Sequence, residues 1–246
     1  MKLSVIVPVY NEKKTVLTLL ERVQAVPFEK EVLVVDDAST DGTSDVLRGL
    51  ALPGVRMFFH ERNQGKGAAI RTAQPHVAGD IVIIQDADLE YSPEEYPKLI
   101  QPILDGEADA VFGSRFIGDR PHRVLLFWHM VGNKLLTLVS NMFTNLNLTD
   151  METCHKAFRA TLFKQLRLTC NRFGFEPEVT ARLAQHRARI YEVGIAYHGR
   201  DYSEGKKISW KDGVAAFYFI VKANVFADRP VTGKSSPPRV EGGAPR

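Results

Sequence analysis

Two acidic residues separated by one position form the feature of the sequence with the most specific chemistry. Asp86 and Asp88 follow the apolar segment 81–85, and Glu90 comes two positions later. Carboxylates that converge at the end of a strand can bind one hard cation, such as Mg²⁺ or Mn²⁺, which prefers oxygen ligands. Such an ion would neutralise a diphosphate leaving group without redox chemistry. A solvated acidic turn is the alternative for an isolated pair of this kind.

A second acidic pair follows an earlier apolar segment in the same manner. Asp36 and Asp37 come directly after residues 31–35. A carboxylate at such a strand end can accept hydrogen bonds from a nucleobase or a ribose. Helix capping is the alternative, and we assign Asp41 with Gly42 to that role.

Two further loops carry polar residues. Tyr10 offers a ring that can stack on a nucleobase, and Glu12 offers an acceptor for the base edge or the ribose, while Asn11 is predicted to cap a helix. The run 62–67 lacks the spacing of a P-loop, so we expect only a tight turn that places Lys66 at the edge of a pocket.

The elements that must position these residues alternate in the first half of the chain. Short β-branched segments separated by helical patterns are typical of strands joined by crossover helices in a largely parallel sheet. We predict strands at 3–7, 31–35, 55–59 and 81–85, and helices at 13–26, 43–50, 66–77 and after Ser92 and Pro93. The loops that follow parallel strands share one edge of the sheet, where ligands bind in open α/β folds.

The second half is mainly helical. We predict helices at 124–146, 160–168, 178–187 and 210–226, and one strand at 189–197. We expect one α/β domain at 1–228, with a nucleotide-sugar and metal half at 1–120 and an acceptor half at 121–228. Residues 229–246 are rich in Pro, Gly and Ser and are predicted to be a disordered tail.

Composition excludes several classes of protein. With 44% hydrophobic and 25% charged residues, the chain is an ordinary globular one, and a net charge of +3 is too small to indicate a nucleic-acid partner. The chain has no run of about 18 apolar residues, so we expect no membrane span. Cys154 and Cys170 have no metal-ligand spacing and are expected to be buried small hydrophobic residues. We expect a cytoplasmic protein that could lie peripherally on the cytoplasmic face of the membrane.

Five motifs in sequence resemble those of family 2 glycosyltransferases. They are Pro8-x-Tyr10-Asn11-Glu12, Asp36-Asp37-x-Ser39-x-Asp41-Gly42-Thr43, Arg62-Asn63-x-Gly65-Lys66-Gly67, Asp86-Ala87-Asp88-Leu89-Glu90-Tyr91 and Gly113-Ser114-Arg115-Phe116. Within that family the chain is most similar to the dolichol-phosphate mannose synthase and dolichyl-phosphate glucosyltransferase branch, up to about Lys207. The resemblance implies a GT-A fold, with a Rossmann-like, mostly parallel sheet flanked by helices. It also implies an inverting, metal-dependent transfer of a hexose from GDP-mannose or UDP-glucose to a polyprenyl or dolichyl phosphate.

The resemblance also implies roles for individual residues. Asp88 and Arg115 would be catalytic, and the metal ligands would be Asp86, Asp88 and Glu90. Arg200 and Lys206, from the late pattern Arg200-x-Tyr202-x-Glu204-x-Lys206, would hold the diphosphate. The full substrate-binding set would be Pro8, Tyr10, Glu12, Val35, Asp37, Asp86, Ala87, Asp88, Arg115, Arg200 and Lys206.

The sequence also indicates which kind of acceptor the enzyme would use. A phosphate monoester is largely ionised near neutral pH and needs no general base, whereas a hydroxyl acceptor does. Arg115, Arg120, His122 and Arg123 are suited to an anionic acceptor, although a solvated basic loop is the alternative for Arg120 and Arg123.

Two segments could meet a lipid. Residues 125–148 and 214–226 are rich in large apolar side chains, so each could lie on a bilayer surface or pack as a buried core helix, the simpler of the two readings for the first segment. The expected partners are therefore a nucleotide-sugar, a lipid phosphate, and either a peripheral membrane surface or a membrane protein.

Two other functions remain open from the sequence. One is a soluble glycosyltransferase that acts on a hydroxyl of a glycan or small molecule. The other is a non-catalytic subunit that binds a nucleotide-sugar.

Overall fold

The computed structural model describes residues 1–118, 127–172, 174–199 and 210–226. In this part of the chain seven strands form one sheet in the order β3-β2-β1-β4-β6-β5-β7. The strands are β1 (Leu3–Val9), β2 (Lys30–Asp36), β3 (Val55–Phe59), β4 (Ile81–Ile84), β5 (Ala110–Ser114), β6 (Lys156–Arg159) and β7 (Ile190–Gly194). All neighbours pair in parallel except β6, which runs antiparallel to β4 and β5. The predicted α/β fold with a mostly parallel sheet is confirmed.

Helices cover both faces of the sheet. One face packs against α1 (Val16–Ala25), α2 (Thr43–Arg48) and α4 (Tyr96–Leu104), and the other against α3 (Lys66–Ala73), α6 (Ala160–Gln165) and α7 (Phe175–Gln185). Two further helices, α5 (Phe127–Thr144) and α8 (Trp210–Val225), pack against each other and against α7. Short 3₁₀ turns, η1 (Gln74–His76) and η2 (Pro93–Glu95), precede β4 and α4.

The central strand shows why this arrangement forms. Val5 and Val7 point to one face and Ile6 to the other, and all three are fully buried. A parallel strand covered by helices on both faces needs apolar residues at every position rather than at alternate ones. The mostly apolar run of β1, interrupted by the buried Ser4, therefore indicates an interior place in the sheet.

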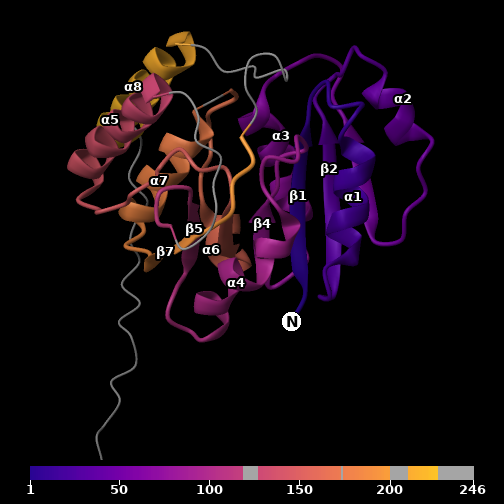
Figure 1. The fold of residues 1–246 in the computed structure, drawn as a ribbon, viewed down its shortest axis with the longest axis horizontal. Helices are drawn as coiled ribbons and strands as arrows, with labels where there is room; N and C mark the ends of the chain where they lie inside the picture. The colour runs from indigo at the N-terminus through magenta and orange to yellow at the C-terminus, as the bar shows by residue number, and fades with distance from the viewer. Residues whose placement is uncertain (119–126, 173, 200–209, 227–246) are drawn as a thin grey trace, which may run out of the picture.

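The parallel strands bring their loops to one edge. Because β1, β2 and β4 pair in parallel, their carboxyl ends lie together, at the top of Figure 1, while the chain begins at the bottom. Helices α5 and α8 lie side by side at the upper left of the same view.

The sequence analysis missed two strands. It assigned no strand to β5 or β6, and it predicted residues 189–197 where β7 spans Ile190–Gly194. The pattern of β5 is weakened by Gly113 and Ser114, residue types that are uncommon within strands. In β6 a buried Lys156 stands at a position where an apolar residue would be expected.

Helix boundaries were partly wrong. The first helix begins at Val16, not at residue 13, and Asn11 does not cap it: with φ of 55°, Asn11 accepts the Thr40 N–H at its Oδ1 over 2.8 Å. Asparagine tolerates this left-handed conformation better than most residues. The helix predicted at 178–187 begins earlier, at Phe175, because Pro177 fits the first turn of a helix.

Further expectations concern the membrane, the cysteines and the tail. No helix among the described residues is long and apolar enough to cross a bilayer. Cys154 and Cys170 are free thiols; Cys170 is buried, as predicted, whereas Cys154 is only partly buried. The tail predicted at 229–246 lies outside the described residues.

Candidate active site

The acidic loop after β4 is held by its neighbours. Gln85 is buried, donating a hydrogen bond to the Tyr91 carbonyl at 3.0 Å and accepting one from the Tyr96 hydroxyl at 3.0 Å. Within the turn, the Glu90 N–H donates to Asp88 Oδ1 at 3.1 Å, next to Leu89, whose φ is 65°. A leucine at positive φ is a strained conformation, and such residues often occur at functional sites.

Lys66 lies against the first carboxylate of this loop. Its ammonium is 2.8 Å from Asp86 Oδ1 and 3.0 Å from Oδ2, and 2.9 Å from Glu176 Oε1 on α7. Burial alone would lower the pKa of Lys66, but the adjacent carboxylate of Asp86 raises it well above its usual value. Burial likewise opposes ionisation of Asp86, and the charge of Lys66 overcomes this to lower the pKa of that carboxyl. Lys66 thus lies between the carboxylates of Asp86 and Glu176, and its motif did not predict these contacts.

Asp37 positions the turn that precedes Lys66. Its Oδ1 accepts the Gln64 N–H at 2.9 Å and lies 2.6 Å from the His60 ring, while Oδ2 accepts the Gly65 N–H at 2.6 Å. The Asp37 residue is only 2% exposed. That it also contacts the nucleotide remains a prediction.

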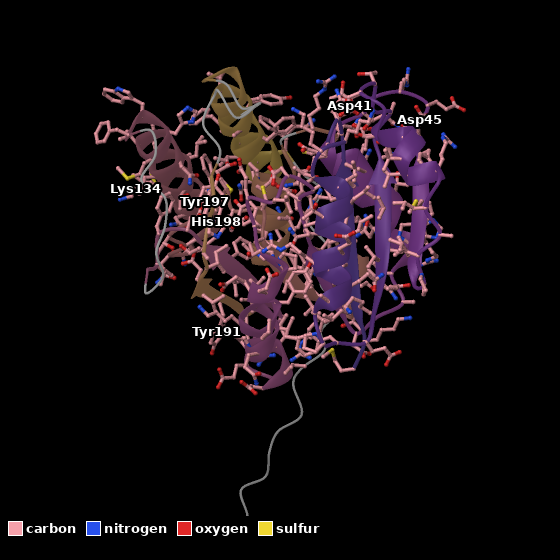
Figure 2. The ribbon with its side chains drawn as sticks, turned by 45° about the vertical axis from the view of Figure 1, so that its right-hand side comes forward. Asp41, Asp45, Lys134, Tyr191, Tyr197 and His198 are labelled. Carbon is pink, nitrogen blue, oxygen red and sulfur yellow. The ribbon has the colours of Figure 1, made fainter. Side chains whose placement is uncertain are left out.

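The predicted nucleotide residues differ in what they expose. Tyr10 is 39% exposed at the end of β1, and Pro8 and Glu12 are partly buried. Val35 and Ala87 are buried in the core, so a contact with a ligand would come from their backbone. Asp41, in the loop before α2, and Asp45, in the first turn of α2, are labelled in Figure 2 and lie at the same end of the sheet.

Asp41 fulfils its predicted helix-end role. Its Oδ1 accepts the N–H of Thr43, the first residue of α2, at 3.0 Å, while Gly42 occupies the cap position with φ of 91°.

Arg115 stands at the end of β5 and forms a fork with Asp150. Its Nε donates to Asp150 Oδ2 at 2.7 Å and its second guanidinium nitrogen to Oδ1 at 2.8 Å. Asp150 is completely buried, whereas the Arg115 side chain is 18% exposed. Burial opposes the charge on Asp150, but the Arg115 guanidinium lowers the pKa of that carboxyl. Asp150 was not among the residues predicted from the sequence.

One aromatic ring connects Arg115 with the acidic loop. The Arg115 guanidinium lies 5.2 Å from the centre of the Tyr197 ring, and the Tyr197 hydroxyl donates to Glu90 Oε2 at 2.7 Å. The next residue, His198, donates its N–H to the Glu90 carbonyl at 3.0 Å. Figure 2 shows Tyr197 and His198 together, away from Asp41 and Asp45.

Next to Asp86 lies a second set of titratable groups, of which only Cys154 was noted from the sequence. Burial, followed by the charge of Glu176, raises the pKa of Glu152 to about 8, and Glu152 Oε1 has no hydrogen-bond partner among the described residues. Burial lowers the pKa of His155 to about 3. Cys154 donates its thiol to Glu176 Oε1 at 3.5 Å. No clear signal in the sequence marks this set, because α7 carries other polar residues beside its two glutamates, namely Thr180, Arg182 and Gln185.

The predicted metal ligands can be compared with this geometry. No group of three His, Cys, Asp or Glu side chains in the described residues converges on one point, and Glu90 is engaged with Tyr197. Asp86 and Asp88 supply the hard oxygen ligands that Mg²⁺ and Mn²⁺ share with phosphate groups. The ammonium on Asp86 shows that a cation fits beside this carboxylate.

Several predicted residues lie outside the described part of the chain. They are Arg120, His122, Arg123, Arg200, Tyr202, Glu204 and Lys206.

The fold and site together define an α/β protein of the GT-A type, with carboxylates at the ends of β2 and β4. The family model described as glycosyl transferase family 2 matches residues 4–167, and the chain belongs to that family. It is therefore an enzyme of the sugar-transferring type.

Relatives and solved structures agree with this assignment. The chain is 30% identical over 224 residues to an undecaprenyl-phosphate mannosyltransferase of Micrococcus luteus, covering 84% of this chain and 87% of that protein. It is 29% identical to a dodecaprenyl-phosphate galacturonate synthase of Rhizobium johnstonii, of which it spans 62%. A crystal structure of glucosyl-3-phosphoglycerate synthase from Mycobacterium tuberculosis with Mn²⁺ and UDP matches the fold with a TM-score of 0.71 at 20% identity, covering 92% of this chain and 81% of that one.

Proposed function

We propose that this enzyme transfers a hexose from a nucleotide-sugar, GDP-mannose or UDP-glucose, to a polyprenyl phosphate at a membrane surface. The similarity to transferases named for undecaprenyl and dodecaprenyl phosphate supports a lipid-phosphate acceptor. Domain limits of 1–228, with the nucleotide half before the acceptor half, belong to the same proposal.

The observation that carries this proposal is the position of Arg115. The buried carboxylate of Asp150 holds this cation one aromatic ring away from the acidic loop that contains Asp88. The Arg115 guanidinium would bind an anion that lies between it and the acidic loop. Both the diphosphate of the donor and the phosphate of the acceptor are such anions.

The reaction that follows is a direct displacement. An oxygen of the acceptor phosphate attacks the anomeric carbon, and the bond from that carbon to the nucleotide diphosphate breaks with its electron pair leaving on the diphosphate. The acceptor phosphate is already ionised near neutral pH, so no side chain has to remove a proton. A divalent cation held by Asp86 and Asp88 would neutralise the leaving diphosphate when bound. Arg115 orients the anionic acceptor, and Tyr10 and Glu12 contact the nucleotide.

The surface formed by α5 and α8 is suited to the lipid. The residues that α5 buries fully are Thr137 and Ser140, while large apolar side chains point outward. The exposed apolar residues of the two helices are Phe127, Trp128, Met130, Val131, Leu135, Leu138, Met142, Phe143, Val214, Phe217, Tyr218, Val225 and the adjoining Phe226. Helices with an aromatic-rich apolar face bind at the boundary of a bilayer. We propose this surface, called the α5–α8 face below, as the membrane contact rather than a buried core packing.

A transfer assay tests the reaction. Purified enzyme with Mn²⁺ and labelled GDP-mannose or UDP-glucose is given undecaprenyl phosphate in vesicles or, in parallel, a water-soluble hydroxyl acceptor. Label that moves into organic solvent and is released by mild acid supports the proposal. Label on the hydroxyl acceptor alone would favour the soluble transferase, and binding of donor without turnover would favour a non-catalytic subunit.

A variant of Asp88 tests the role of the acidic loop in the same assay. We expect Asp88→Ala to abolish nearly all transfer while the melting temperature stays close to that of the wild type, because a partly exposed loop carboxylate contributes little to packing. Full transfer by the variant would contradict the assignment of Asp88.

Flotation tests the membrane contact. Wild-type protein should rise with anionic vesicles, and the double variant Trp128→Ser with Leu138→Ser should stay in the soluble fraction. Equal flotation of both proteins would show that the α5–α8 face does not bind lipid.

A further inference from the structure

Lys66 occupies a position between two carboxylates of different elements. It contacts both oxygens of Asp86, on the loop after β4, and one oxygen of Glu176, in the first turn of α7. The side chains of Lys66, Asp86 and Glu176 are 13%, 18% and 5% exposed, so the three charges are largely shielded from water. They form one chain of contacts from the predicted metal site to the interior.

The contact with Asp86 competes with a metal ion. Mg²⁺ binds carboxylate oxygens at about 2.0–2.1 Å, and the Lys66 ammonium already contacts both oxygens on one side of the Asp86 carboxylate. An ammonium and a divalent ion cannot share this side, because two like charges a few ångströms apart in a shielded site repel strongly. Lys66 therefore has to leave Asp86 before Asp86 can bind metal with both oxygens available.

Glu176 offers the ammonium a second position. It already lies 2.9 Å from Lys66 Nζ, and it stands at the N-terminal turn of α7, where the helix dipole stabilises a negative charge. The flexible stem of a lysine allows its ammonium to move over a short distance without backbone rearrangement.

We infer that Lys66 is an exchangeable counter-ion: it neutralises Asp86 while no metal is bound and moves onto Glu176 when a divalent cation binds. This inference rests on the proposed metal-dependent transfer. Lys66 and Glu176 are positioning residues in this scheme, since they set the metal affinity of the site through Asp86. The arrangement keeps the donor-free site neutral at Asp86 and favours loading of the metal together with the diphosphate.

The test is a titration of donor-free protein with Mn²⁺, read from the loss of the spin-resonance signal of free Mn²⁺. Four proteins are compared: wild type, K66M, E176Q and the double variant. We expect K66M to bind Mn²⁺ about tenfold more tightly, a change of ~1.4 kcal/mol, because the competitor is gone. E176Q should bind it about tenfold more weakly, because Lys66 then has no second carboxylate.

The double variant separates exchange from a general field effect. If Glu176 acts through Lys66, E176Q changes the Mn²⁺ affinity of the K66M protein by less than about twofold, a non-additive result. Additive effects of the two substitutions would mean that both charges act only through the field, and would overturn the inference. Weaker Mn²⁺ binding by K66M would overturn it as well. K98M, which removes a partly exposed lysine paired with Glu95, is the control for a change in overall charge.

Two further outcomes keep the results distinct. If K66M does not fold, the comparison of E176Q with the double variant carries the test, and removal of Lys66 should tighten Mn²⁺ binding about a hundredfold there, whereas a step of only about tenfold is the additive result that overturns the inference. If no protein binds Mn²⁺, even with UDP or GDP present, the proposed metal dependence fails and the inference fails with it. Normal Mn²⁺ binding by the wild type with additive variants removes the inference alone.

Discussion

Replacing Asp150 by asparagine should destabilise the protein strongly and misplace Arg115. Asp150 is completely buried and accepts a forked pair of hydrogen bonds from Arg115, as well as one from Asn133 at 3.1 Å. Removing one partner of a buried ion pair costs about 3–5 kcal/mol, and we expect ~3 kcal/mol because asparagine keeps one acceptor oxygen. For a chain of this length that corresponds to a fall in melting temperature of roughly 6–12 °C. Transfer to the lipid phosphate should fall as well, since the guanidinium loses the group that orients it.

A surface pair of the same chemistry provides the matched control. Asp109 receives a similar fork from Arg189, with contacts of 3.1 and 2.8 Å, but this pair is exposed to solvent. Asp109→Asn should therefore lower the melting temperature far less than Asp150→Asn and leave transfer unchanged. Thermal and urea unfolding of both variants, followed by the transfer assay, make the comparison. Equal loss of stability in the two variants would refute the argument from burial.

Two further predictions concern a buried acid and a close backbone contact. The pKa of Glu152 is raised from 4.5 to about 8, so the folded protein holds a proton that the unfolded chain loses between these pH values, and stability from this group falls as pH rises through that window. The pKa of His155 is lowered from 6.5 to about 3, and this group makes stability rise with pH only below pH 6.5. The free energy of unfolding of the wild type should therefore decline from pH 6.5 to 8 because of Glu152. Glu152→Gln should remove this decline, as measured by urea unfolding at several pH values. A Cβ at Gly67 would approach the Cys170 carbonyl oxygen more closely than 3.0 Å, so Gly67→Ala should cost about 1–3 kcal/mol. Gly132→Ala, on a helix with open space around that position, should instead stabilise by about 0.5–1 kcal/mol, and the same sign for both alanines would contradict this.

The parts of the fold that could be predicted are those whose pattern is local. The strands β1, β2 and β4 are mostly apolar and buried, β3 is a shorter and partly exposed run with Arg56 inside it, and each is followed by a polar loop. Such mostly apolar runs predict parallel strands covered by helices. β5 and β6 could not be predicted in the same way. Lys156 in β6 is buried because its ammonium donates to the Met151 carbonyl at 3.0 Å, a partner that exists only once the loop before the strand has folded. The sequence shows a lysine, and the reason it can enter a sheet lies in the tertiary structure.

The α5–α8 face illustrates a different limit. Its apolar residues are evident in the sequence, but a core helix and a surface helix can carry the same residue types. Burial of Thr137 and Ser140 in α5, with Trp128 and Leu138 turned outward, separates the two cases. That orientation depends on α7 and α8, which contact α5 from distant parts of the chain.

The candidate site shows why motifs identify acidic residues more readily than their roles. Asp37 and Asp86 both end strands of the same sheet, yet the structure uses their oxygens differently: Asp37 accepts backbone N–H groups of the turn before Lys66, and Asp86 accepts the Lys66 ammonium itself. The first carboxylate therefore sets the path of the turn whose lysine neutralises the second. A substitution at Asp37 should thus affect the predicted metal site by displacing Lys66, in addition to any loss of a direct contact with a nucleotide. Coupling of this kind comes from three loops meeting at one edge of the sheet, and the sheet order that brings them together is what a single sequence leaves undetermined.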